Sequence, residues 1–463
     1  MIRVFRHYIP TSFLILGLIE GLLFVGSVYV GAELRFFGDE PEGVVSIDPL
    51  LPKALLFALV MMSCLAAMGL YQRHLREGLG GMVLRIGISF GVGVVIMSVL
   101  FYLFPVMFLG RGVFGIAFAV ALAGILAARM IFMSVVDYDT LKRRIMVLGT
   151  GERAASIGQL KRKVDRRGWL AVGYVHLEED RAVQVDSSLV IHPEVTLVEL
   201  ARARQVDEIV VALDERRRSL PVHEILDCKM SGIQVIDLLT FFERQTGRIK
   251  LDLLHPSWLI FSDGFQQSLL RQMTKRTFDV LVSLGLLMVA LPFMLATMLA
   301  IKIEDRGQVF YRQVRVGQNW RLFQVLKFRS MREDAEKGGA QWAQKDDDRI
   351  TRVGQFIRKT RIDELPQLIN VLRGEMSFVG PRPERPEFVE QFSDSIPYYS
   401  ERHRVKPGIT GWAQICYPYG ASEKEAFEKL QYDLYYVKNY SVFLDLTILL
   451  QTAEVILWGK GAR

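Results

Sequence analysis

The sequence predicts a membrane protein in three parts. These are a bundle of four transmembrane helices at residues 1–140, a Rossmann-like α/β domain at 141–262, and a mixed α/β domain at 270–463 that begins with a re-entrant membrane helix. Three observations support this prediction. The 463 residues are too many for one domain, and the 51% that are hydrophobic concentrate in long apolar segments near the N-terminus. From residue 144 onward, short β-branched runs alternate with polar amphipathic stretches.

Four apolar segments near the N-terminus approach or exceed the roughly 20 residues needed to cross the hydrocarbon core of a bilayer. They are Thr11–Val30, Ala54–Leu70, Ile86–Leu103 and Val113–Met133. A cleaved signal peptide is the alternative for the first segment. Its apolar run is long and no clear small-residue cleavage site follows, so we expect four transmembrane helices.

Basic residues predict how these helices are oriented. They gather on one side of the spans, and are Arg3, Arg6, Arg73, Arg76, Arg85, Lys142, Arg143 and Arg144. The segment from Glu33 to Asp48, on the other side, carries acids instead. Because short loops rich in Lys and Arg stay in the cytoplasm, the N-terminus and everything after Lys142 are predicted to start there.

The composition also limits the classes of partner. A net charge of +7 fits attraction to an anionic lipid bilayer at least as well as nucleic-acid binding, and we predict no nucleic-acid partner. The three cysteines, Cys64, Cys228 and Cys416, are scattered without metal-ligand spacing. The sequence therefore predicts no disulfide framework.

The middle part contains a glycine turn of the kind that opens a dinucleotide-binding fold. A predicted strand, Ile145–Leu148, leads into a G-x-G-x-x-A turn before a helix, and its candidate nucleotide-binding residues are Gly149, Gly151 and Ala154. Glu178 is a candidate ribose ligand. Further strands are predicted at Ala171–Val175, Glu208–Ala212 and Gln234–Ile236. We favour the alternative, a doubly wound domain that binds nothing or a regulatory ligand, because one such fingerprint is a weak signal.

A fifth apolar block, Val280–Ile301, carries no charge and is long enough to span a membrane. Both of its flanks are basic, with Arg271, Lys275, Arg276, Lys302, Arg306, Arg312 and Arg315. Pro292 interrupts the predicted helix and favours a bend there. A re-entrant helix keeps both basic flanks in the cytoplasm, whereas a fifth span, the alternative, would put the following domain outside.

The most informative segment is Arg361–Gly374, in which two adjacent carboxylates, Asp363 and Glu364, precede an apolar helix. Asp363 is predicted to be the N-cap of this helix, with Pro366 in its first turn and Gly374 at its end. The predicted apolar face of the helix consists of Leu365, Leu368, Ile369 and Leu372. A carboxylate at a helix N-terminus stays ionised, and free N–H groups beside it suit phosphate. The segment therefore predicts a nucleophile beside a phosphate-binding site.

Cations are expected to converge on this pair. Lys327 and Arg329 alternate onto one face of a predicted strand, and a Gly-Pro-Arg-Pro turn carries Arg382. The candidate ligands for substrate phosphates are Lys327, Arg358 and Arg382. A solvated strand face explains Arg329 equally well, and His403 is expected to be structural. Asp346–Asp348 provides an alternative, the Asp-x-Asp metal site of an ordinary glycosyltransferase.

Over roughly residues 270–463 these motifs resemble the bacterial sugar transferase family of monotopic polyprenol-phosphate phosphoglycosyl transferases. The runs that carry the resemblance are KFRSM, DELPQL-NVLRGEMS, VGPRP, PGITGWAQ and YDLYY. With its four spans and middle domain, the whole chain is similar to the large exopolysaccharide-priming form, of the undecaprenyl-phosphate glucose phosphotransferase type. Many smaller members have a Ser-Pro break in the re-entrant helix. Here the break is Leu291-Pro292, so the bend depends on Pro292 alone.

The resemblance implies the activity and the partners. It implies transfer of a sugar 1-phosphate from a UDP-sugar to undecaprenyl phosphate, with release of UMP, by a catalytic domain on the cytoplasmic side of the bacterial inner membrane. The implied partners are the UDP-sugar, undecaprenyl phosphate and the lipid bilayer, with a homo-oligomer as a further option. Two alternatives stay open: a conventional membrane glycosyltransferase, which releases UDP, and a non-catalytic sensor or scaffold.

The resemblance also implies Mg²⁺ and a catalytic Asp-Glu dyad, which matches Asp363 and Glu364. Asp363 is expected to attack the sugar-bearing phosphorus and to form a covalent phosphosugar intermediate. Glu364 is expected to be its partner for the metal or for a proton, since Mg²⁺ prefers carboxylates together with substrate phosphates. Both residues are thus candidate catalytic groups and candidate metal ligands.

Overall fold

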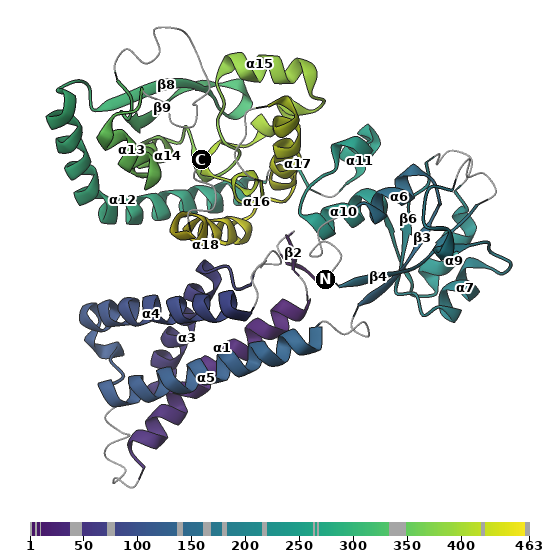
Figure 1. Ribbon diagram of the computed structural model, residues 1–463, viewed down its shortest axis with the longest axis horizontal. Helices are drawn as coiled ribbons and strands as arrows, with labels where there is room; N and C mark the ends of the chain where they lie inside the picture. The colour runs from purple at the N-terminus through teal and green to yellow at the C-terminus, as the bar shows by residue number, and fades with distance from the viewer. Residues whose placement is uncertain are drawn as a thin grey trace. The chain divides into compact units, whose positions relative to one another are not determined.

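The computed structural model of the chain describes residues 2–4, 7–9, 11–37, 49–71, 79–136, 142–160, 168–177, 183–214, 220–262, 264–265, 268–332, 349–417 and 422–458. The chain divides into two compact units. One unit holds most of the N-terminal helices and an α/β sheet. The other holds residues 261–463 with residues 2–8 and 65–70. Figure 1 labels most of the helices and several strands of both units.

Four long apolar helices follow one another near the N-terminus: α1 (Thr11–Arg35), α3 (Leu50–Ala67), α4 (Leu79–Leu103) and α5 (Arg111–Val136). Each contains a stretch of 18 to 23 residues that is apolar enough to cross a membrane, which confirms the predicted apolar helices. The shorter elements are β1 (Ile2–Val4), β2 (His7–Ile9) and the 3-10 helix η1 (Pro105–Met107). Three residues used to predict the orientation, Arg6, Arg73 and Arg76, lie outside the described residues, as does most of the acidic segment.

Helices α1 and α5 are joined by a buried ion pair. Nε of Arg129 lies 2.6 Å from Oε1 of Glu20, and the two side chains are 4% and 0% exposed. Nη2 of Arg129 also donates a hydrogen bond to Oε2 of Glu20 at 3.0 Å. Charged groups buried in an apolar bundle require such pairing, so this contact fixes how the two helices face each other.

A five-stranded parallel sheet follows the helices, in the order β5-β4-β3-β6-β7. The strands are β3 (Arg143–Leu148), β4 (Trp169–Val175), β5 (Val190–Ile191), β6 (Glu208–Val211) and β7 (Gln234–Asp237). The helices are α6 (Glu152–Gly158), η3 (Ser187–Leu189), α7 (Leu197–Ala203), α9 (Val222–Met230), α10 (Leu238–Thr246), η4 (Leu251–Leu253) and α11 (Pro256–Phe261). The predicted parallel α/β sheet is confirmed.

Both faces of this sheet are covered by helices (Figure 1). Ile145 and Val147 of β3 share a core with side chains of α6 and α10. Met146 and Leu148, which point to the opposite face, share a second core with side chains of α7 and α9. This alternation explains why residues Ile145 to Leu148 of β3 are all apolar and buried, as expected for a central strand of a parallel sheet.

Helix α12 (Leu269–Asp305) is one helix of 37 residues that contains Pro292. It includes the basic flank before the predicted apolar block as well as the block itself. A straight helix of this length would measure about 55 Å, well beyond the hydrocarbon core of about 30 Å. Figure 1 shows that α12 is not straight: two arms meet at a bend. Ala290 and Met294 pack against Phe328, so the helix is also part of the core of the C-terminal unit.

Besides α12, the C-terminal unit contains shorter elements, among them an antiparallel hairpin and a parallel strand pair. The strands are β8 (Phe310–Val316) and β9 (Leu322–Phe328) in the hairpin, and β10 (Ser377–Val379) and β11 (Gly408–Thr410) in the pair. The 3-10 helices are η5 (Gln318–Trp320), η6 (Ile362–Glu364) and η7 (Tyr399–Arg404). The α-helices are α13 (Arg352–Lys359), α14 (Gln367–Arg373), α15 (Pro386–Ser395), α16 (Trp412–Cys416), α17 (Glu423–Asn439) and α18 (Val442–Trp458).

Candidate active site

Asp363 and Glu364 lie in the tight turn η6, and both are buried, with 9% of each residue exposed. The prediction that Asp363 is the N-cap of the following helix is wrong. Arg361, in the left-handed region with φ of 60°, is the N-cap of η6, and Pro366 precedes α14. The turn bonds its backbone locally, from Glu364 N to Arg361 O at 3.2 Å. It can therefore turn two adjacent carboxylates inward, which a regular helix would not do.

Helix α14 is tied to the strand beside it by Asn370. The Asn370 Oδ1 accepts a hydrogen bond from Leu326 N at 3.0 Å, and Nδ2 donates to Gln324 O at 2.7 Å. Nothing in the sequence marked Asn370, although an amide inside an apolar helix is the kind of signal that would have found it. Helix α14 ends at Gly374 as predicted. Its buried side chains are Gln367, Leu368, Asn370 and Val371. Of the predicted apolar face only Leu368 is among them, and Leu365, Ile369 and Leu372 are half-buried.

Three cations surround Glu364. Its Oε1 lies 3.2 Å from Lys327 Nζ, 3.1 Å from Arg382 Nη2 and 3.8 Å from Arg361 Nη1. Burial alone would raise the pKa of Glu364, but these cations together hold that pKa well below its ordinary value. Glu364 is therefore ionised at neutral pH and holds the cations together.

Asp363 has a different environment, although it is adjacent in the chain. Burial, followed by the neighbouring charge of Glu364, raises the pKa of Asp363 above its ordinary value, while Lys327, Arg361 and Arg358 act in the opposite direction. Its Oδ1 is buried and has no hydrogen-bond partner among the residues that the structure describes. Buried carboxylate oxygens are nearly always bonded, so an unengaged one beside three cations marks the atom that is available for chemistry.

The predicted phosphate ligands divide into two groups. Lys327 and Arg382 lie together at Glu364, and Arg361, which the sequence motifs had not singled out, joins them. Arg358 lies in the last turn of α13, where its charge affects the pKa of Asp363 without a described hydrogen bond or ion pair to the dyad.

The sequence offered two other candidates, Arg329 and the acidic run Asp346–Asp348. Arg329 pairs with Asp305 of α12 rather than with the dyad. Because Arg329 is buried, the alternative of a solvated strand face is wrong for this residue as well. The alternative metal site, Asp346–Asp348, lies outside the described residues.

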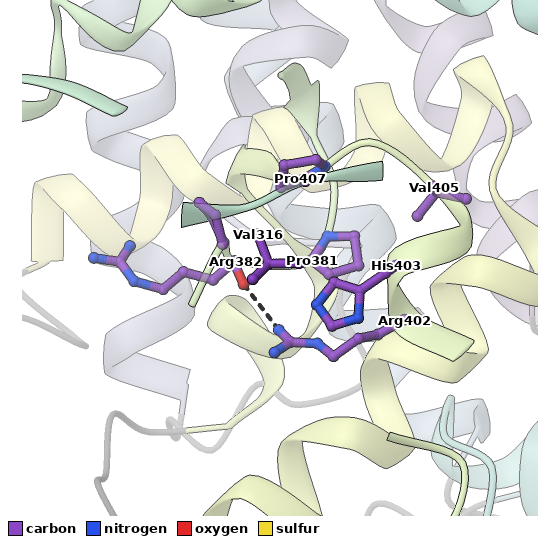
Figure 2. Close-up of a pocket in the computed structure, with 9 residues that line it drawn as sticks. Val316, Pro381, Arg382, Arg402, His403, Val405 and Pro407 are labelled. Carbon is purple, nitrogen blue, oxygen red and sulfur yellow. Dashed lines mark hydrogen bonds between the residues drawn. The ribbon is translucent and has the colours of Figure 1, made fainter. Parts of the chain in front are cut away.

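A small cavity lies behind the loop that carries Arg382 (Figure 2). It is lined by residues at the end of β8, in the Arg382 loop, in η7 and just before β11, among them Val316, Pro381, His403 and Pro407. The volume of about 10 Å³ has room for about one water molecule, which excludes a nucleotide or a sugar. Figure 2 shows the Arg382 side chain pointing away from this cavity. His403 is buried there under Trp320, with ring centroids 5.0 Å apart.

A magnesium ion fits the dyad in part. Asp363 offers an unengaged carboxylate oxygen, which is the kind of ligand that Mg²⁺ prefers, whereas Oε1 of Glu364 is already shared by cations. The described part of the chain contains no group of three or more His, Cys, Asp or Glu side chains that could hold a metal. An ion here would take its remaining ligands from substrate phosphates and water, as Mg²⁺ commonly does.

The glycine turn of the α/β sheet has the predicted conformation, but the N–H groups that would bind an anion there already bond to a side chain. Gly149 has φ of 116°, and the backbone N–H groups of Glu152 and Arg153 donate to the Asp214 carboxylate at 3.0 and 2.9 Å. A Cβ on Gly151 would lie 1.9 Å from Asp214 Oδ2. In a dinucleotide-binding fold this glycine lets a pyrophosphate approach the turn, whereas here Gly151 makes room for the Asp214 carboxylate. Glu178, the candidate ribose ligand, lies outside the described residues.

Two family models match the chain. The model of the bacterial sugar transferases matches residues 270–459, and the model of a CoA-binding domain matches residues 66–228. Coenzyme A carries a diphosphate, and the N–H groups that would bind such a group at the glycine turn already donate to Asp214. The residues at this turn therefore do not fit coenzyme A.

Three relatives are similar over long stretches. A UDP-glucose:undecaprenyl-phosphate glucose-1-phosphate transferase of Xanthomonas campestris pv. campestris is 30% identical over 485 residues, which cover 99% of this chain and 96% of the relative. A protein of the same name from Klebsiella pneumoniae is 34% identical over 327 residues, or 69% of each chain. A UDP-N-acetylgalactosamine-undecaprenyl-phosphate N-acetylgalactosaminephosphotransferase of Aeromonas hydrophila is 45% identical over 236 residues. That match spans 51% of this chain and about half, 55%, of the relative.

Proposed function

The chain belongs to the bacterial sugar transferase family, and from this we propose that it transfers a sugar 1-phosphate from a UDP-sugar to undecaprenyl phosphate, with release of UMP. It is a phosphoglycosyl transferase, as its relatives are. The observation that carries the proposed chemistry is the unengaged Oδ1 of Asp363, buried beside a carboxylate that gathers three cations. The reaction would be the first membrane step of exopolysaccharide synthesis.

In the first step, a carboxylate oxygen of Asp363 attacks the sugar-bearing phosphorus of the UDP-sugar. A bond forms between Asp363 and phosphorus, the bond to the bridging oxygen breaks, and that oxygen leaves with its electron pair as part of UMP. Lys327 and Arg382, which Glu364 holds in place, are positioned to neutralise the phosphate charge that would otherwise repel a carboxylate. A magnesium ion at Asp363 and the diphosphate would add to this neutralisation.

In the second step, a phosphate oxygen of undecaprenyl phosphate attacks the same phosphorus and releases Asp363 as a carboxylate. The product is undecaprenyl diphosphate carrying the sugar, and the enzyme returns to its starting state. Glu364 Oε1 already accepts from Lys327 and Arg382, so we assign it to holding these cations rather than to taking up a proton. Covalent catalysis of this kind divides one difficult transfer between two anions into two easier ones.

The acceptor would reach the site from the membrane, and α12 is suited to deliver it. Its bend, its internal Pro292 and the basic residues at both ends support a re-entrant helix in the bacterial inner membrane, with the catalytic unit on the cytoplasmic side. Arg276 of α12 donates to Val371 O and Leu372 O of α14, at 2.5 and 2.6 Å. The helix in the membrane is thereby attached to the helix that follows the dyad.

One assay tests the overall reaction. Membranes that contain the protein are incubated with several UDP-sugars, with and without undecaprenyl phosphate, and the nucleotide product is identified. We expect UMP and a lipid-linked phosphosugar when one of the sugars is accepted. Release of UDP would indicate a conventional glycosyltransferase, and no turnover with any donor would indicate a sensor or scaffold.

A further inference from the structure

The loop that carries Arg382 is held through its backbone rather than through its side chains. Successive carbonyl groups accept hydrogen bonds from different elements: Pro381 O from Gly408 N at 2.9 Å and Pro383 O from Arg315 Nη1 at 3.2 Å. Before them, Val379 O accepts from Tyr436 at 2.9 Å. A proline on each side of Arg382 limits the backbone further. The position of the Arg382 guanidinium is thus set by what grips this loop.

Arg402 grips the loop at Arg382 itself. Its Nη2 donates to the main-chain carbonyl of Arg382 at 2.9 Å, as the dashed line in Figure 2 shows. The same nitrogen lies 2.9 Å from Oδ2 of Asp433 in α17, and Nη1 donates to Tyr399 OH at 2.7 Å. All three side chains are buried, with 3 to 6% exposed.

The two arginines therefore occupy opposite sides of one loop. Figure 2 shows the Arg382 side chain leaving the loop on the side away from Arg402 and His403. On its own side the Arg382 Nη2 reaches Glu364 Oε1 at 3.1 Å. A guanidinium that must bind phosphate in a fixed orientation gains from a rigid backbone, because a misplacement of about 1 Å can reduce a rate about 100-fold.

We infer that Arg402, held by Asp433 and Tyr399, is a positioning residue that fixes the Arg382 guanidinium for the sugar-bearing phosphate. The inference rests on the proposed role of Arg382 in phosphate binding. Arg402 touches neither substrate nor reacting atoms and acts only through the loop. The effect of Arg402 on catalysis should therefore vanish in a variant whose residue 382 can no longer contact phosphate through two N–H groups.

A double-mutant cycle on the full-length protein in detergent tests this inference. Arg402→Lys keeps the charge opposite Asp433 but loses the forked contact with the carbonyl and Tyr399. We expect it to lower kcat/KM for the UDP-sugar about 100-fold in the wild-type background, and less than about threefold in an Arg382→Lys background. Arg404→Lys, two residues away and on the exposed pair with Glu401, is the matched control and should leave kcat/KM unchanged.

Equal and additive losses in both backgrounds would overturn the inference, because they would mean that Arg402 acts independently of Arg382. If Arg402→Lys does not fold, Tyr399→Phe removes one hydrogen bond with little change in volume, and a smaller loss should again disappear in the Arg382→Lys background. Thermal midpoints of all variants separate positioning from stability. A wild-type protein without turnover would contradict the proposed function instead, and is recognised before any variant is compared.

Discussion

Lys327 Nζ lies 3.2 Å from Glu364 Oε1, which joins the strand β9 to the turn η6 by one ion pair. Asn370 holds α14 against the same strand by its hydrogen bonds to Leu326 and Gln324. The hairpin, the turn η6 and α14 are therefore joined to one another by these contacts. It also explains why Glu364 is ionised in a largely buried site, where a carboxylate without cations would not be.

Arg382→Lys should be a severe change although it preserves the charge. A lysine ammonium is a point charge that cannot reproduce a planar guanidinium contact to both Glu364 and phosphate. We expect kcat/KM for the UDP-sugar to fall roughly 10- to 1,000-fold, as removal of an electrostatic stabiliser commonly does. Steady-state UMP release measures this. Near wild-type kinetics would show that Arg382 contributes only its charge.

The membrane topology of α12 can be tested with cysteines at Gln272 and Gln318, in a variant whose three native cysteines are replaced. If α12 is re-entrant, both positions are cytoplasmic, because basic residues flank the apolar block on each side. Neither cysteine should then react with an impermeant thiol reagent in intact cells, and both should react after lysis. Labelling of position 318 alone in intact cells would demonstrate a fifth span. Pro292→Leu removes the helix-breaking residue and should shift labelling in that direction.

Gly151→Ala should destabilise the α/β sheet region without changing catalysis. The added methyl group would lie 1.9 Å from Asp214 Oδ2, so the carboxylate that bonds the N–H groups of Glu152 and Arg153 must move. We expect a lower thermal midpoint or lower expression, with unchanged kcat and KM in the protein that folds. Gly158→Ala, where a Cβ meets nothing within 4 Å, is the matched control. A nucleotide-dependent change in activity that Gly151→Ala abolishes would make this region regulatory.

His403 predicts a component of acid sensitivity. Burial, and then the charge of Arg402, lowers the pKa of His403 to about 3, whereas the unfolded imidazole titrates near 6.5. Between these values the unfolded chain binds a proton that the native protein does not, so stability is fully present above about pH 6.5 and decreases as the pH falls toward 3. Thermal midpoints between pH 7 and 4.5 should fall less steeply in His403→Gln than in the wild type. Parallel profiles would show that His403 does not contribute.

The elements that depend on local pattern could be predicted from the sequence. Apolar length predicted α1, α3, α4 and α5, and β-branched runs predicted every parallel strand except the two-residue β5. The motifs around Asp363 predicted a carboxylate pair with Lys327 and Arg382. The sequence did not predict that Asp363 lies in a separate 3-10 turn. Pro366 fits the first turn of one longer helix as well as it fits the position between a turn and the helix that follows.

The contacts that shape the site depend instead on residues far apart in the chain. Asn370 bonds to Gln324 and Arg402 pairs with Asp433, and these partners are set by packing that no local spacing encodes. Asp214 is a similar case. It follows β6, and only the sheet order, with β6 beside β3, brings it to the glycine turn. Asn370, Arg402 and Asp214, which position other groups, were therefore not predicted, whereas Lys327 and Arg382 lie at the dyad as the local motifs predicted.

The covalent role of Asp363 is tested most directly by a single-turnover experiment without acceptor. Purified protein is mixed with Mg²⁺ and a UDP-sugar labelled in the sugar, and UMP is followed while the protein is digested and its peptides are analysed. We expect up to one UMP per active site and a phosphosugar on the peptide that contains Asp363. Asp363→Asn, which keeps the shape and removes the nucleophile, should release none and lose several orders of magnitude in turnover. Strictly acceptor-dependent UMP release with no labelled peptide would contradict the covalent route, and the dyad would then have to activate undecaprenyl phosphate for direct attack.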